Sequence, residues 1–232
     1  WDVMSQAGTN GTDVGTTITT QGDILYRDGS GLQRLGAGTS GQFLKTQGTG
    51  ANPIWANNTA GVIQTVRYGT GSNWQQSMSG SSFTQINNGA TDFDVAITPS
   101  ATGNSIMIQG QIHVELHPSA SDYGGGIRIK RAISGGATDY LAIGNTHGSR
   151  PRVSFWVGQN SPGYQSAISF CAIDKSHSTT SAITYSLEMI NHGSITASFN
   201  YHPNHGDGGN GYQSQAFSTI MAQELGHTVT DA

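Results

Sequence analysis

The stretch SIMIQGQIHVEL, from Ser105 to Leu116, decides the fold, because apolar and polar side chains alternate along most of its length. Alternation with a period of two is typical of a β-strand that has one buried face and one polar face. In residues 112–117, which extend this stretch by one residue, three apolar side chains lie on one side of the strand and three polar ones on the other. The apolar ones are Ile112, Val114 and Leu116, and the polar ones are His113, Glu115 and His117.

Segments of the same kind recur on both sides of this stretch. They are Val62–Tyr68, Phe93–Thr98, Gly126–Ile133, Tyr140–Ile143, Arg152–Val157, Ala167–Ile173, Ala182–Ile190, Ser194–Phe199 and Ala216–Leu225. Turn-forming runs separate them, among them Pro99–Asn104, Ser134–Gly136 and Asn160–Gly163. About ten strands without a helical pattern predict an all-β fold, and we expect an antiparallel jelly-roll sandwich over residues 61–232.

The composition fits short polar strands joined by tight turns. Charged residues make up 10% of the chain and hydrophobic residues 34%, and there are 33 glycines. This proportion of hydrophobic residues is low for a large core, so we expect copies of the chain to complete their cores by associating.

Several classes of function are disfavoured. The net charge of −4 provides no basic surface for nucleic acid or anionic lipid, and no apolar run is long enough to insert into a membrane. Cys171 is the single cysteine, which rules out an intrachain disulfide. The first residue is Trp1 rather than Met, so we expect the sequence to start within a longer polypeptide.

Residues 1–60 differ from the rest. Their apolar residues form short patches bounded by Gly or Asp, such as Ile24 with Tyr26 and Phe43 with Leu44. One copy could not bury enough surface to offset an ordering cost of about 1–2 kcal/mol per residue. The segment is therefore either a disordered linker or an extended segment that intertwines in a trimer, and the regular spacing of its apolar residues favours the trimer.

Part of this segment resembles the repeat unit of bacteriophage tail fibres. The resemblance covers Thr20–Leu35, TQGDILYRDGSGLQRL, then Gly36–Thr46, GAGTSGQFLKT, and ends at Asn52–Ala56, NPIWA. The repeat unit of that family opens with a Gly-Asp motif followed by leucine and tyrosine, matched here by Gly22–Tyr26, and it closes with a Pro-x-Trp motif, matched by Pro53–Trp55. The resemblance implies a shaft or adaptor segment that contacts other tail or baseplate proteins.

Residues 61–232 are similar to the trimeric jelly-roll heads found at the ends of phage fibres, which resemble tumour necrosis factor. The similarity lies in Ala96–Pro99, Gly103–Ile108 and the terminal segment Gln215–Leu225. It implies a homotrimer located in the virion, whose head binds a host-surface receptor, most simply a glycan. The alternative is a capsid cement or decoration trimer, because the same fold serves both roles.

The polar side of the 105–117 strand is a candidate metal site. His113, Glu115 and His117 are spaced about 7 Å apart along a strand, so they would need further ligands from other copies on a three-fold axis. The alternatives are a polar outer face or a neutral row of hydrogen bonds between subunits. We expect no other cofactor.

Tyrosines near glycine-rich turns are candidate receptor-binding residues, because Tyr among Ser, Gly and Asn suits adaptable recognition surfaces. They are Tyr123, Tyr140, Tyr164, Tyr201 and Tyr212, and between the last two lie His202, His205 and Asp207. The alternatives are tyrosines that merely mark strand ends and, for residues 200–212, a solvated hairpin loop or a metal site.

Other residues have expected structural roles. Trp156, Phe170 and Cys171 are expected to pack in the core or between subunits, and Trp74 to be exposed or interfacial. Arg128, Lys130 and Arg131 are expected to form a solvated or salt-bridged sheet edge.

We expect no enzymatic activity. Glycoside hydrolysis needs two carboxyl groups held about 5–10 Å apart, and the sequence does not bring Glu115, Glu188 and Glu224 together. A nucleophile elbow, a phosphate-binding loop and a serine triad are also missing from the sequence.

Overall fold

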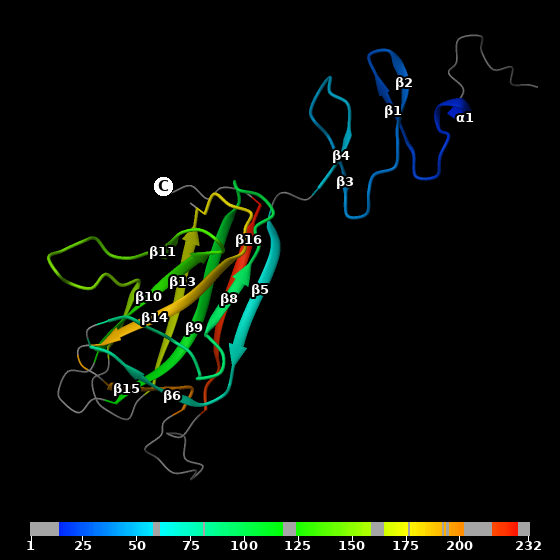
Figure 1. Cartoon of the computed structure of the whole chain (residues 1–232). Coiled ribbons are helices and arrows are strands. Elements are labelled where there is room, and N and C mark those ends of the chain that lie inside the picture. The colour runs from blue at the N-terminus through cyan, green and yellow to red at the C-terminus, as the bar shows by residue number, and fades with distance from the viewer. Residues whose placement is uncertain are drawn as a thin grey trace, which may run out of the picture. The chain divides into compact units, whose positions relative to one another are not determined.

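The structure is a computed structural model of the 232-residue chain. It describes residues 14–57, 61–80, 82–117, 124–158, 165–175, 177–191, 193, 195–201 and 215–226 (Figure 1). The chain divides into two compact units, Trp1–Thr59 and Ala60–Ala232, called here the N-terminal and C-terminal units.

The N-terminal unit contains a one-turn helix, α1 (Val14–Thr17), and a first hairpin of β1 (Ile24–Asp28) and β2 (Gly31–Leu35). The Asp28 carboxylate closes the turn by accepting hydrogen bonds from the N–H groups of Ser30 at 2.8 Å and Gly31 at 3.1 Å. Gly31 has a φ of 135°, which side chains disfavour, so the turn needs glycine there.

A second hairpin pairs β3 (Phe43–Lys45) with β4 (Ile54–Ala56). The Trp55 indole N–H donates to the Gly36 carbonyl oxygen at 2.6 Å. Large apolar side chains nevertheless stay exposed on this hairpin: Phe43, Leu44 and Ile54. Intertwining with other copies would cover them and stays a prediction.

The C-terminal unit is an all-β sandwich of two sheets, which confirms the predicted fold class. Sheet I runs β5-β16-β9-β13, and β15 and β6 continue it beside the far end of β9. Its strands are β5 (Val62–Thr70), β6 (Trp74–Met78), β9 (Ser105–His117), β13 (Ser166–Asp174), β15 (Ile195–Phe199) and β16 (Ser218–Leu225).

Sheet II has β10 and β14 at its centre. β11 and β12 lie along one side of β10, and β7 and β8 lie along the far side of β14. Its strands are β7 (Thr84–Gln85), β8 (Asp94–Ile97), β10 (Gly124–Ile133), β11 (Thr138–Leu141), β12 (Phe155–Gly158) and β14 (Ile183–Asn191).

The two strand orders interlock as a jelly roll. Eight principal strands remain when β6, β7 and β15 are left out and β11 and β12 are counted as one. Numbered along the chain, they lie in the order 1-8-3-6 across sheet I and 2-7-4-5 across sheet II. Every strand pairing among the described residues is antiparallel, as expected for two Greek keys.

The core lies between the sheets and follows the alternation read from the sequence. Ile106, Ile108, Ile112, Val114 and Leu116 of β9 are all buried, as are Ile127 and Ile129 of β10 and Leu187 and Met189 of β14. Gly110 interrupts this apolar row, and Phe170 of β13 lies beside it: a side chain at Gly110 would meet Phe170 Cζ at 2.7 Å.

Two expectations about this unit are wrong. Trp74 was expected to be exposed or interfacial, but it is buried and stacks on Phe199 with ring centroids 4.7 Å apart. Arg128, Lys130 and Arg131 were expected at a sheet edge, but β10 pairs with strands on both sides. The physical reason in both cases is strand order, because β15 carries Phe199 beside β6 and β14 covers the second side of β10.

A buried polar network joins the two sheets across the core. Arg131 Nη1 donates to Asp174 Oδ1 at 2.8 Å, and the Tyr185 hydroxyl donates to Asp174 Oδ2 at 2.7 Å. Burial, and then the charge of Asp174, raise the pKa of Tyr185 far above its usual value, so the phenol stays protonated and remains the donor.

Candidate functional site

The side chains of sheet I that point away from the core form a largely uncharged surface, called here the outer face of sheet I. It includes Thr65 and Arg67 of β5, Thr219, Met221 and Gln223 of β16, Gln109 and Gln111 of β9, and Ser169 and Cys171 of β13. Among the described side chains on this side of the four strands, the charged ones are Arg67, which is exposed, and Glu115, which is fully buried.

Neutral amides run across this face in a hydrogen-bonded row. Gln109 Nε2 donates to Gln223 Oε1 at 3.2 Å, and Gln223 Nε2 donates to Thr65 Oγ1 at 3.2 Å. The row therefore links β9, β16 and β5 without an ion pair. Such groups can be desolvated at a lower cost than charges, because their hydrogen bonds are already formed within the chain.

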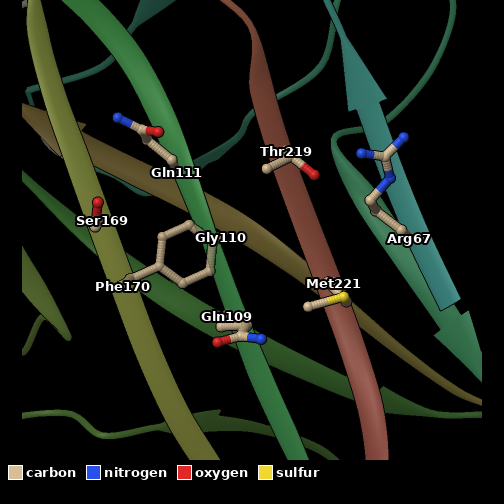
Figure 2. A pocket seen from close by; sticks show the side chains of 8 residues that line it. All are labelled: Arg67, Gln109, Gly110, Gln111, Ser169, Phe170, Thr219 and Met221. Carbon is tan, nitrogen blue, oxygen red and sulfur yellow. The ribbon is translucent and has the colours of Figure 1, made fainter. Parts of the chain in front are cut away.

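A hollow of about 540 Å³ lies on the outer face of sheet I (Figure 2). It is lined by Arg67, Gln109, Gly110, Gln111, Ser169, Phe170, Thr219 and Met221, which come from four different strands. The small Ser169 leaves room between the longer glutamine and methionine side chains. The hollow could receive an apolar or amide side chain from another molecule.

An exposed aromatic residue borders this face. Phe217 is 48% exposed, and its ring covers the backbone of Gly69, where a Cβ would meet ring carbons at 2.7 Å. The Arg67 guanidinium lies 6.0 Å from the centre of the same ring. This distance is at the limit of a cation–π interaction.

The candidate metal residues do not form the exposed polar row that the sequence suggests. Glu115 is fully buried, and His113 is partly buried. Burial lowers the pKa of His113, which favours its neutral form. The side chain of His117 lies outside the described residues. No group of three or more His, Cys, Asp or Glu side chains within the described ranges is placed to hold a metal, so a metal shared between copies stays a prediction.

Most candidate receptor-binding residues lie outside the described residues: Tyr123, Tyr164, His202, His205, Asp207 and Tyr212. Tyr201 is described and half-buried. Tyr140 lies on β11, where its hydroxyl accepts a hydrogen bond from Arg128 Nη2 at 2.8 Å. Two of the eight candidates are thus described, and receptor binding by the full set stays a prediction.

The outward side of sheet II carries the charges that sheet I lacks. Arg128 donates through Nε and Nη2 to Glu188 Oε2, at 2.8 and 2.6 Å, and Lys130 Nζ lies 3.1 Å from Glu188 Oε1. The Arg128 guanidinium also stacks 3.6 Å from the ring centres of Phe83 and Tyr140. The expectation of salt bridges is confirmed for this cluster.

Trp156 of β12 does not pack in the core of the chain. Core or interface packing was expected, but within the chain its side chain is 61% exposed on sheet II. Its neighbours Phe155 and Val157 point to the core, so the period of the strand turns Trp156 outward. Exposure in a single chain leaves interface packing open.

Comparison with known proteins identifies no family: no family model matches the chain, and no curated protein matches it. Solved structures that the chain resembles include that of the Gt strain of infectious bursal disease virus, with 13% sequence identity and a TM-score of 0.37. Another is the VP2 subviral particle of the same virus, at 14% identity and a TM-score of 0.33. The matches cover 85% and 84% of this chain but 45% and 44% of those chains, so this chain spans less than half of their length. A likeness this weak carries no argument about function.

Proposed function

We propose that this protein is a structural component of a virus particle that assembles by packing the outer face of sheet I against further copies of the same chain. The observation that carries the proposal is the near absence of exposed charge on that face. Interface cores are depleted of charged residues, whereas solvent-facing surfaces retain them.

The contrast between the two sheets makes this observation specific. The chain has few charged residues overall, at 10%, so an uncharged patch could arise by chance. Sheet II nevertheless has three partly exposed charged side chains on its outward side, Arg128, Lys130 and Asp94, and the buried Glu188 pairs with the first two. Sheet I, with strands of similar length, places Arg67 alone in contact with solvent among the described side chains of its outer face.

The size of the face is adequate for a stable contact. Four strands about 4.8 Å apart, each contributing roughly eight residues at about 3.3 Å, cover about 500 Å² in projection. The relief of the side chains raises the accessible area above that value. A standard interface takes about 800 Å² from each partner, so the outer face and its bordering loops are of the right order.

The expected stoichiometry of three, and a position on a tail fibre, rest on the resemblance of residues 20–56 to the tail-fibre repeat. In that position the C-terminal unit would bind a host-surface glycan or protein. The alternative, a cement or decoration trimer on the capsid, would use the same self-association face. Catalysis has no part in either role.

Sedimentation of the full chain at micromolar concentration tests the self-association. The wild type is expected to be an oligomer, and a variant with both Ser169→Glu and Met221→Glu is expected to sediment as a monomer with unchanged circular dichroism. Ala96→Glu is the matched control, because Ala96 is exposed on sheet II. A monomeric wild type, or a double variant that stays oligomeric, would show the proposal to be wrong.

Labelling of the parent particle distinguishes the two positions. Gold-labelled antibody against the C-terminal unit should mark fibre tips if the fibre role is correct, and the free protein should then block adsorption to the host. Label on tailless capsids, with no effect of free protein on adsorption, would instead support the cement role.

A further inference from the structure

We infer that Trp156 is a stacking platform for a neutral sugar, located on the outward side of sheet II. The inference rests on the proposed function, because that role places this sheet at the surface of a particle. The residue belongs neither to the self-association face nor to the candidate receptor-binding tyrosines.

The indole is held against bare backbone. A Cβ placed on Gly124 would lie 2.6 Å from Trp156 Cζ2, 3.0 Å from Cε2 and 3.1 Å from Nε1. A Cβ on Gly158 would lie 3.8 Å from Cδ1 and Nε1. Gly124 and Gly158 are paired across β10 and β12, two residues along each strand from the pair of Gly126 with Trp156. The ring therefore covers a cross-strand pair of glycines.

The Trp156 ring packs against the two glycines and still remains largely exposed. Contacts with three adjacent indole atoms above Gly124 hold one side of the ring, yet the side chain remains 61% exposed. Val153 covers the neighbouring Gly126, where a Cβ would collide with it, and Ile190 on the other side of Gly126 is 8% exposed. A ring that already packs against backbone on one side loses less conformational entropy when a ligand stacks on it than a free side chain would.

Polar groups lie further along the same side of the sheet. Arg128, Glu188 and Gln85 are paired across β10, β14 and β7, two residues along from the rung of Gly126 and Ile190. The indole itself lies over Gly124, four residues of β10 from Arg128, and four residues of strand span about 13 Å, which is the length of two to three sugar rings. Their donors and acceptors are already arranged by hydrogen bonds within the chain, such as Lys130 Nζ to Gln85 Oε1 at 3.4 Å.

This combination fits a pyranose. One face of many hexopyranoses presents C–H groups, which are attracted to the negative face of an aromatic ring, while the hydroxyl groups at the edge need hydrogen-bonding partners. A flat apolar ligand without hydroxyl groups would leave the Arg128 and Glu188 side unused, and an anionic ligand would have to compete with the Glu188 carboxylate for Arg128 and Lys130.

The test uses the full chain labelled with ¹⁵N and a panel of neutral oligosaccharides: cellohexaose, maltohexaose, mannohexaose and chitohexaose. The chain has four tryptophans, so four indole signals are expected, and the signal missing in Trp156→Phe identifies Trp156. At least one oligosaccharide is expected to shift that signal selectively. An intact chain in which none of the four shifts it would overturn the inference.

Variants separate the platform from general surface effects. Trp156→Ala should weaken binding about tenfold or more, which corresponds to ~1.4 kcal/mol. Gly124→Ala should weaken it similarly while retaining the indole, because the new Cβ removes the seat of the ring. Phe217→Ala is the matched control, since Phe217 is also an exposed aromatic on a glycine but borders sheet I, and it should bind like the wild type.

Sedimentation of the same samples separates this inference from the proposed function. A monomeric wild type that still shifts Trp156 with sugar would refute self-association and support the platform. An oligomer that dissociates on Trp156→Ala and gives no sugar response would show that the ring packs between copies, and the platform would then be wrong.

Discussion

Replacement of Glu224 by Gln should destabilise the C-terminal unit strongly, because this carboxylate is fully buried at one end of β16. Its Oε1 accepts hydrogen bonds from the Ser100 N–H at 2.7 Å, the Ser100 hydroxyl at 2.7 Å and Asn104 Nδ2 at 2.6 Å. Its Oε2 accepts one from Gln64 Nε2 at 2.5 Å. The carboxylate thereby ties β16 to β5 and to the loop before β9.

The magnitude follows from the donors that the amide cannot satisfy. A glutamine at position 224 can face the Ser100 and Asn104 donors with its oxygen, but its NH₂ group then meets the NH₂ group of Gln64. Gln64 cannot turn its oxygen around without giving up its bond to the Thr98 carbonyl oxygen at 2.7 Å. One unsatisfied buried donor, together with weaker bonds to a neutral acceptor, costs about 2–4 kcal/mol.

Thermal unfolding at a fixed protein concentration measures this cost. For a unit of this size the loss corresponds to a decrease in Tm of about 5–12 °C. The control is Asp139→Asn, which removes one negative charge from a side chain that is 63% exposed, and whose partner Arg131 retains Asp174. A Glu224→Gln variant that melts within about 2 °C of the control would refute the reasoning.

The acid response of the same group supplies an independent check. Desolvation raises the pKa of Glu224, but the hydrogen bonds from Asn104, Gln64 and Ser100 outweigh it, and the net pKa is lowered. A carboxyl group with a lowered pKa in the folded state contributes stability above its unfolded pKa of about 4.3, and this stability is lost as the pH falls through the folded pKa. The wild type should therefore lose more Tm below pH 4.5 than Glu224→Gln does, and parallel curves would contradict this.

Three further substitutions have defined outcomes. Trp74→Ala removes the buried stack on Phe199 and should cost about 3–5 kcal/mol in urea unfolding. Tyr185→Phe leaves Asp174 without the phenol donor and should cost about 1–3 kcal/mol by the same measurement. Gly110→Ala forces a Cβ against Phe170 and the backbone of Thr219, and should lower Tm although Ala has the higher strand propensity.

The strands of the C-terminal unit could be predicted because alternation is a local property. Each of the ten predicted segments contains an observed strand or overlaps one, including the decisive β9. β6 and β7 were missed for a physical reason. β6 has the polar Gln76 between the buried Trp74 and Met78, where its Nε2 donates to the Gln85 carbonyl oxygen at 2.7 Å, so its apolar alternation is interrupted. β7 is only two residues long.

Side-chain burial was harder to predict, because it depends on partners that are distant in the sequence. Glu224 is buried by Ser100 and Asn104, more than a hundred residues earlier in the chain. Trp74 lies in a polar run and is buried by Phe199. For Trp156 the signal was present, since Phe155 and Val157 on either side of it have to face the core, and the glycines of β10 leave space for an indole.

The two outward surfaces have a geometric relation that links the two proposals. Sheets I and II face each other across one core, so their outer faces point in opposite directions. If copies associate through the outer face of sheet I, sheet II is left facing away from the contact. Trp156 would then remain accessible in the assembly, with one platform for each copy. Several weak platforms on one particle would bind a glycan-covered surface with far higher avidity than a single chain. Attachment that depends on Trp156 should therefore be lost in the monomeric Ser169→Glu/Met221→Glu variant, although its binding to a single oligosaccharide chain should persist.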